Sequence, residues 1–180
     1  MTNAELFCFA GKCLALDGRP GLREEVAALV SGGVVPWEKF VWTGSSHFVL
    51  PALFTSFDRN GILPMLPEEL TEHMRHIYNL NAERNRRIVM QCRQISQLLF
   101  PAGIRPVFLK GAALLLMGLY KDMGDRMMED IDLLLPEAEI PPALEILQKG
   151  GYLQHPVDEG KGEVYADHHH LPPMYHPGQV

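Results

Sequence analysis

The sequence predicts an α+β fold in which a helical N-terminal region, residues 1–100, packs on an α/β core formed by residues 101–180. Apolar residues before Pro101 recur at the three- and four-residue steps of helices. After Pro101, short β-type runs alternate with helical segments. Hydrophobic residues make up 47% of the 180-residue chain, which is enough to bury a core. We therefore expect helices followed by the order β-α-β-α and a further strand.

Composition narrows the class of protein. The net charge of −6 makes binding to a nucleic acid through bulk charge unlikely. The three cysteines include no C-x-x-C pair, which is typical of reduced thiols in the cytoplasm. The N-terminus lacks a basic start followed by an apolar run, and no run of 18 apolar residues occurs. We expect a cytoplasmic protein with neither a signal peptide nor a membrane span.

Four short helices are expected before a long one. They should cover residues 4–16, 22–30, 37–42 and 47–58. Ser45-Ser46 has the residue type that caps a helix N-terminus, so we expect it to begin the fourth helix. Turn-forming pairs follow three of the helices: Asp17-Gly18, Gly32-Gly33 and Asn60-Gly61.

A long helix is expected to begin at Pro67, which suits a first helical turn. Its buried stripe should consist of Leu70, Met74, Ile77, Leu80, Ile88, Cys92, Ile95, Leu98 and Leu99. Four arginines lie along the same helix, either as a solvated face or facing a triphosphate or an acidic partner: Arg84, Arg86, Arg87 and Arg93.

The second region should begin with the turn at 101–106 and a strand at 107–109. The elements expected after it are a helix at 112–119, a loop at 120–129, a strand at 130–135, a helix from Pro136 to Gly150-Gly151, a polar loop at 154–164, a strand at 168–175 and a hairpin turn at 176–179.

Asp130 and Asp132 occupy the start of an expected strand. Residues i and i+2 of a strand point the same way, about 6–7 Å apart, so both carboxylates should project from one face. Mg²⁺, or Mn²⁺ in its place, binds carboxylates together with substrate phosphates. Such a site serves phosphoryl or nucleotidyl transfer. The alternative is two surface aspartates at a strand start.

A second half-site precedes them at Lys110, Gly111 and Ala112, where a strand passes through a tight turn into a helix. A glycine lets backbone N–H groups approach a ligand, and a helix N-terminus favours anions. Lys110 adds a positive charge. Many strand–helix connections have this sequence pattern, so the pattern alone does not indicate a phosphate site. It indicates one here because the D-x-D strand follows it.

The run LKGAALLLMGLYKDMGDRMMEDIDLLLPE resembles the nucleotidyltransferase superfamily related to polymerase beta. It is most similar to the uncharacterised nucleotidyltransferase branch. The resemblance extends over roughly residues 35–180, and its specific part is the core at 108–135. The matching positions are Lys110-Gly111, Leu114, Tyr120, Gly124, Arg126 and Asp130-Ile131-Asp132-Leu133-Leu134.

The resemblance implies a mixed β-sheet flanked by helices, with Lys110, Gly111 and Ala112 holding the nucleotide phosphates. Asp130 and Asp132 would bind two metal ions, and an acceptor would attack the α-phosphate of a nucleoside triphosphate and release pyrophosphate. The acceptor would be a small molecule or a protein. Arg126 could hold the triphosphate as a bidentate fork, or it could pair with Asp125 or Glu129.

The chain departs from the superfamily pattern at three points, one of which is a longer spacing from Gly111 to Asp130 that the uncharacterised branch shares. Gly111-Ala112 replaces the usual Gly-Ser or Gly-Gly, so no hydroxyl reaches the phosphate. The third metal carboxylate should lie beyond Val180, in a chain that we expect to be truncated at its C-terminus. An open sheet edge there would favour homo-oligomers. The incomplete site leaves an alternative, a non-catalytic module that binds nucleotide or another protein.

A third interpretation rests on Asp167 and the following His168, His169 and His170. On a strand, the first and last histidines share a face, and imidazole suits zinc. With Asp167 or His155 they would form the centre of a metal-dependent hydrolase. The alternative is a polar strand that lines the nucleotide cleft.

Overall fold

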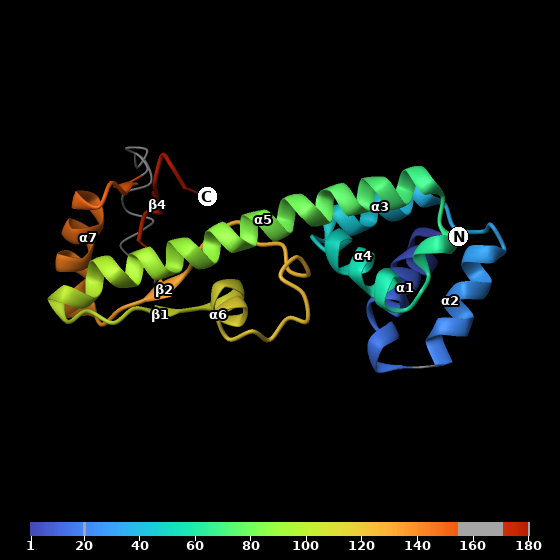
Figure 1. Ribbon diagram of the computed structural model, residues 1–180, viewed down its shortest axis with the longest axis horizontal. Helices are drawn as coiled ribbons and strands as arrows, with labels where there is room; N and C mark the ends of the chain where they lie inside the picture. The colour runs from blue at the N-terminus through green and yellow to red at the C-terminus, as the bar shows by residue number, and fades with distance from the viewer. Residues whose placement is uncertain (20, 155–170, 180) are drawn as a thin grey trace. The chain divides into compact units, whose positions relative to one another are not determined.

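The computed structural model describes residues 1–19, 21–154 and 171–179 (Figure 1). The chain forms two compact units, and one boundary between them falls inside helix α5 (Glu68–Leu99). Unit 1 comprises residues 1–86 and 117–129, and unit 2 comprises residues 87–116 and 130–180. The expected domains 1–100 and 101–180 remain a prediction, because spatial contacts do not test independent folding.

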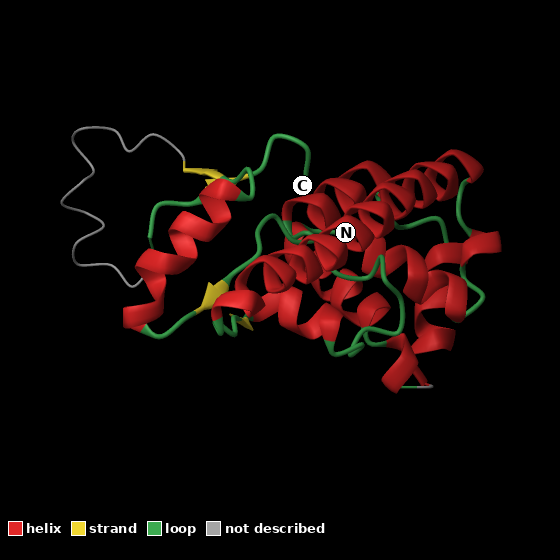
Figure 2. Cartoon of the chain, turned by 60° about the vertical axis from the view of Figure 1, so that its left-hand side comes forward, coloured by secondary structure: helices red, strands yellow, loops and turns green. Residues whose placement is uncertain are grey.

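The α+β class with a helical N-terminal part is confirmed. Helices dominate the chain, and the strands are short (Figure 2). Among the described residues, no helix combines the length and apolar character that a membrane span requires.

Unit 1 contains the four short helices that the sequence predicted, followed by the first part of α5. They are α1 (Asn3–Leu14), α2 (Gly21–Ser31), α3 (Trp37–Ser46) and α4 (Leu50–Arg59), with short 3-10 helices η1 (Leu16–Gly18) and η2 (Leu63–Met65). Their core contains three fully buried phenylalanines, Phe9, Phe40 and Phe57. The ring of Phe40 lies 5.6 Å from that of Phe9 and 6.0 Å from that of Phe57, between centroids. Unit 1 is therefore held together by aromatic packing between α1, α3 and α4.

The predicted cap of the fourth helix is wrong, because Ser45-Ser46 forms the last turn of α3. Phe48 has a left-handed φ of 56°. Its N–H donates to the Ser45 carbonyl, and the Val49 N–H donates to the Gly44 carbonyl at 2.8 Å. These two bonds are the pattern of a Schellman helix end, in which the left-handed position is usually glycine. A phenylalanine there hid the helix end from sequence analysis.

Unit 2 contains the rest of α5 and two small sheets. Its other elements are η3 (Phe100–Ala102), β1 (Val107–Phe108), α6 (Lys110–Leu116), β2 (Leu133–Leu134), η4 (Glu137–Glu139), α7 (Ile140–Lys149), β3 (Leu153–Gln154) and β4 (Met174–Tyr175). A core of buried side chains joins α5 to α7: Ile95, Leu99, Ile104, Ala143, Leu147 and Tyr152.

The expected mixed sheet is not what the described residues form. They form two separate antiparallel pairs, with Val107 opposite Leu134 in the first and Leu153 opposite Tyr175 in the second. The first pair stays short because the chain turns into α6 at Lys110 and because Pro106, directly before β1, has no N–H to donate. β3 was not predicted, because a polar loop is expected from residue 154.

Candidate functional site

The acidic pair lies just before β2, and not inside it as predicted. β2 begins at Leu133, so the strand expected at 130–135 is shorter at its start. Asp132 still extends the pairing of the two strands, because the Leu109 N–H donates to its carbonyl at 2.9 Å. This bond brings the end of β1, and the helix that follows it, beside Asp132.

Lys110 is in direct contact with Asp132. Its Nζ lies 2.8 Å from Asp132 Oδ2, and the side chains are 66% and 17% exposed respectively. The pKa of Lys110 is raised, first by its hydrogen bond to Asp132 and then by the negative charges of Asp132 and Asp130. Unit 2 therefore brings together three of the predicted site residues, one ammonium and two carboxylates.

The unusual backbone conformation of this turn belongs to Lys110 and not to Gly111. Lys110 has a φ of 49°, whereas Gly111 is absent from the positive-φ positions. L-residues rarely adopt such a φ, and the conformation costs of the order of 1 kcal/mol or more. Gly111 and Ala112 are buried in the first turn of α6. Gly111 therefore does not supply the left-handed position of this turn, and the approach of the turn to a phosphate remains a prediction.

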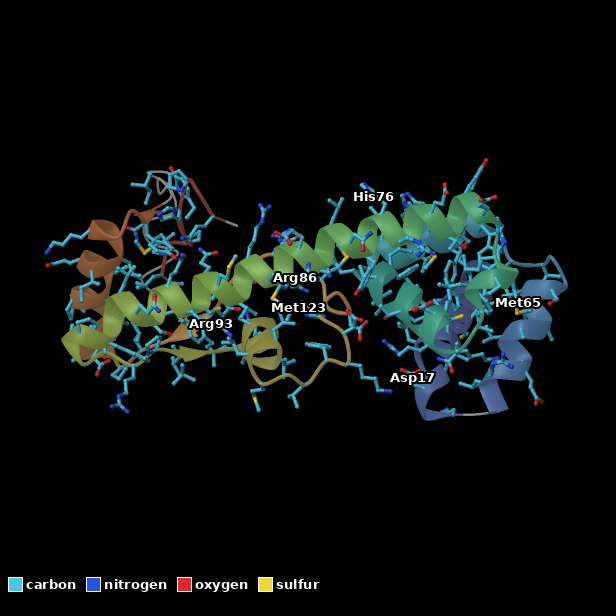
Figure 3. The ribbon with its side chains drawn as sticks, in the orientation of Figure 1. Asp17, Met65, His76, Arg86, Arg93 and Met123 are labelled. Carbon is cyan, nitrogen blue, oxygen red and sulfur yellow. The ribbon has the colours of Figure 1, made fainter. Side chains whose placement is uncertain are left out.

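The loop that carries Arg126 lies in unit 1, where two asparagines of α5 hold it. The Asn81 amide donates to the carbonyls of Gly124 at 2.7 Å and Arg126 at 3.0 Å. The Asn85 amide donates to the carbonyls of Met123 and Arg126, both at 2.7 Å. Asn81 is 5% exposed and Asn85 is 0% exposed. Met123 lies beside this part of α5, where its carbonyl accepts from Asn85 (Figure 3). The two amides replace the backbone bonds that an irregular loop lacks.

Tyr78 makes a further attachment for the same loop. Its hydroxyl donates to Asp122 Oδ1 at 2.5 Å, and the Gly124 N–H donates to the same oxygen at 3.1 Å. Burial, the Asp122 hydrogen bond and nearby negative charge raise the pKa of Tyr78 to about 12. Gly124 packs against the ring, since a Cβ built there would lie 2.3 Å from Tyr78 Cε2. The glycine of the predicted G-x-R segment thus has a steric role.

Arg126 is exposed and makes no side-chain hydrogen bond or ion pair with the residues that the structure describes. Neither of the two acidic partners considered for it pairs with its guanidinium in the part of the chain that the structure describes, and only the Asp125 carboxylate is engaged elsewhere. Asp125 accepts a hydrogen bond from the Thr55 hydroxyl and lies 3.6 Å from Arg59 Nη1. The Glu129 carbonyl accepts from Arg84. Within the described residues, Arg126 is thus paired with neither Asp125 nor Glu129, and its role stays a prediction.

Tyr78, Asn81 and Asn85 were not among the residues predicted to have a role. Leu80, which the helical period predicts in the buried stripe of the long helix, is 57% exposed. The stripe runs through Asn81 and Asn85 in strict alternation of three- and four-residue steps: Met74, Tyr78, Asn81, Asn85, Ile88, Cys92, Ile95 and Leu99. Two asparagines on a buried stripe were a usable signal, because buried amides require hydrogen-bond partners.

Asp130 and Asp132 are the candidate metal ligands among the described residues. The described residues contain no group of three or more His, Cys, Asp or Glu side chains placed to hold a metal ion. Asp167 and His168–His170 lie outside those residues, so the predicted hydrolase centre is not addressed. The donor set fits Mg²⁺, because carboxylate oxygens are its preferred protein ligands and the pair already attracts the cationic Lys110.

Comparison with known proteins agrees with the motif. Residues 34–178 match the model of a family described as uncharacterised nucleotidyltransferase. The chain therefore belongs to this family of nucleotidyltransferases. No match was found among curated proteins or solved structures. The wider relationship to polymerase beta remains a prediction.

The asparagine attachment gives a prediction about stability. Asn85→Ala should lower the free energy of unfolding by about 2 kcal/mol, because two loop carbonyls lose their donor in a buried setting. Asn79→Ala is a matched control, since Asn79 is exposed on the same helix. It should change the stability by less than about 0.5 kcal/mol. Urea unfolding of both variants measures the difference, and equal midpoints would contradict the attachment.

Proposed function

We propose that this protein transfers a nucleoside monophosphate from a nucleoside triphosphate to a small-molecule or protein acceptor, with Mg²⁺ or Mn²⁺. Family membership over residues 34–178 supports the reaction class. The observation that carries the proposal is the contact of Lys110 with Asp132 at the start of β2, beside Asp130. Carboxylates for a metal and an ammonium for phosphates then lie at one end of a strand pair.

Each residue has a part in this reaction. Asp130 and Asp132 would hold the metal, which supplies positive charge against the phosphates. Lys110 and the first turn of α6, with Gly111 and Ala112, bind phosphate oxygens. Arg126 belongs to the loop of unit 1, and its part in holding the triphosphate stays a prediction from the sequence motif. The acceptor oxygen or nitrogen forms a bond to the α-phosphorus and loses its proton to water. The bond from the α-phosphorus to the α–β bridging oxygen breaks, and pyrophosphate leaves with that electron pair.

A second candidate is a nucleotide-binding module without turnover. It is favoured by one observation, the lack of a three-ligand metal group among the described residues. Such a module would keep Lys110 and the aspartates as a nucleotide site while lacking the full charge compensation of a two-metal centre.

Pyrophosphate release distinguishes the two candidates. The protein is incubated with ATP, GTP, CTP or UTP, with Mg²⁺ or Mn²⁺, and with small-molecule or protein fractions of a cell extract as acceptor. We expect pyrophosphate with at least one nucleotide and one fraction. Calorimetric binding without pyrophosphate would favour the module. If neither binding nor release occurs with any nucleotide, both candidates are wrong.

A further inference from the structure

Lys110 has two incompatible tasks in the proposed site. Its ammonium contacts the carboxylate of Asp132 and interacts with the charge of Asp130. The proposed function, on which this inference rests, gives the same ammonium to the nucleotide phosphates and the same carboxylates to a metal ion. One ammonium group at Asp132 Oδ2 takes the position that a metal ligand bond would use and repels a divalent cation. The Lys110–Asp132 contact therefore competes with binding of a metal ion at Asp132.

The two ends of this ion pair differ in exposure. The Lys110 side chain is 66% exposed, whereas that of Asp132 is only 17% exposed. Exposed ion pairs are weak, and a long lysine side chain changes rotamer freely. A triphosphate presents several negative charges, so it competes well for Lys110. Asp132, which is more enclosed, stays in place when the lysine leaves.

The backbone places the lysine at this position. Lys110 begins α6 with a φ of 49°, directly after the Leu109 N–H that donates to the Asp132 carbonyl. A glycine would adopt this φ without strain, so the residue type here is not explained by backbone conformation. The side chain and its charge are what lysine adds to the turn.

We propose that Lys110 is a built-in counter-cation of the carboxylate pair, which the triphosphate of an incoming nucleotide draws away so that a metal ion can bind. Binding of metal is then conditional on nucleotide. The metal alone binds weakly, and the metal with its nucleotide binds well, because the nucleotide both brings charge to the metal and removes the competing ammonium.

Titration with Mn²⁺ alone tests this directly, with free Mn²⁺ measured by its electron paramagnetic resonance signal. Lys110→Met keeps the length of the side chain and removes its charge. It should bind Mn²⁺ alone roughly tenfold more tightly than the unchanged protein does. Lys149→Met is the matched control, because Lys149 is an exposed lysine of unit 2 that pairs with Glu145 at 3.9 Å. It should leave the Mn²⁺ affinity unchanged.

A second titration adds each nucleoside triphosphate to the Mn²⁺. Lys110→Met should then lose the advantage and bind the Mn²⁺–nucleotide roughly tenfold more weakly than the unchanged protein. Equal Mn²⁺ affinities of Lys110→Met and Lys149→Met in the absence of nucleotide would overturn the proposal, with circular dichroism showing that both variants are folded. Failure of the proposed function looks different: the unchanged protein and Asp132→Asn would then show no difference in Mn²⁺–nucleotide binding.

Discussion

Asp132→Asn should lower the rate of pyrophosphate release by about a hundredfold or more. The amide keeps the size of the side chain but removes a negative charge from the proposed metal site. Charge compensation by a metal is worth several kcal/mol in the transition state, and each 1.36 kcal/mol is a factor of ten in rate. The stability should change little, because the ion pair with Lys110 is open to solvent on the lysine side.

Glu145→Gln is the matched control for this variant. Glu145 is an exposed carboxylate of α7 in unit 2, and its side chain is 73% exposed beside Lys149. It should leave both the rate and the unfolding midpoint unchanged. If Asp132→Asn kept the rate of the unchanged protein while Glu145→Gln behaved likewise, the carboxylate pair would have no part in the reaction.

Gly124→Ala should lower the free energy of unfolding by about 3 kcal/mol. Its new Cβ would lie 2.3 Å from Tyr78 Cε2 and 2.6 Å from Tyr78 Cδ2. The ring has little freedom to move away. It packs against Phe54 with centroids 5.2 Å apart, and its hydroxyl donates to Asp122. The loop must therefore shift, and the carbonyl bonds to Asn81 are strained or lost.

Gly11→Ala controls for the general effect of replacing a glycine. Gly11 lies in α1, and a Cβ there meets nothing within 4 Å. This variant should raise the stability by about 0.5–1 kcal/mol, because alanine is the better helix former. Chemical denaturation of both variants gives the comparison. A Gly124→Ala protein as stable as Gly11→Ala would show that the loop does not pack on Tyr78 in solution.

The helices of the N-terminal region could be predicted because the spacing of apolar residues within each helix is a local feature of the sequence. Apolar residues at three- and four-residue steps identified α1, α2, α3, α4 and α5 in the right order. Element ends were less predictable where an unusual residue took a turn position. Phe48 ends α3 and Lys110 begins α6, each with a positive φ that sequence rules assign to glycine.

The candidate site was predictable in its residues but only partly in its contacts. Lys110, Asp130 and Asp132 were selected from two short motifs, and the pairing of β1 with β2 brings those motifs together. The attachment of the loop to α5 was not foreseen. Its hydrogen bonds join residues 38 to 45 positions apart. The three- and four-residue spacing of apolar residues in a helix carries no information about hydrogen bonds over such separations. Leu80 was predicted in the buried stripe because it is apolar, whereas the buried positions at this part of α5 are held by the polar residues Asn81 and Asn85.

Nucleotidyl transfer is tested most directly by finding which phosphate of the nucleotide becomes attached to the acceptor. The protein, with the nucleotide and acceptor fraction that release pyrophosphate, is given that nucleotide labelled either at the α-phosphate or at the γ-phosphate. The α label should become attached to the acceptor while the γ label leaves as pyrophosphate, and Asp130→Ala with Asp132→Ala should abolish both. Transfer of the γ label to the acceptor, or its release as orthophosphate, would contradict nucleotidyl transfer.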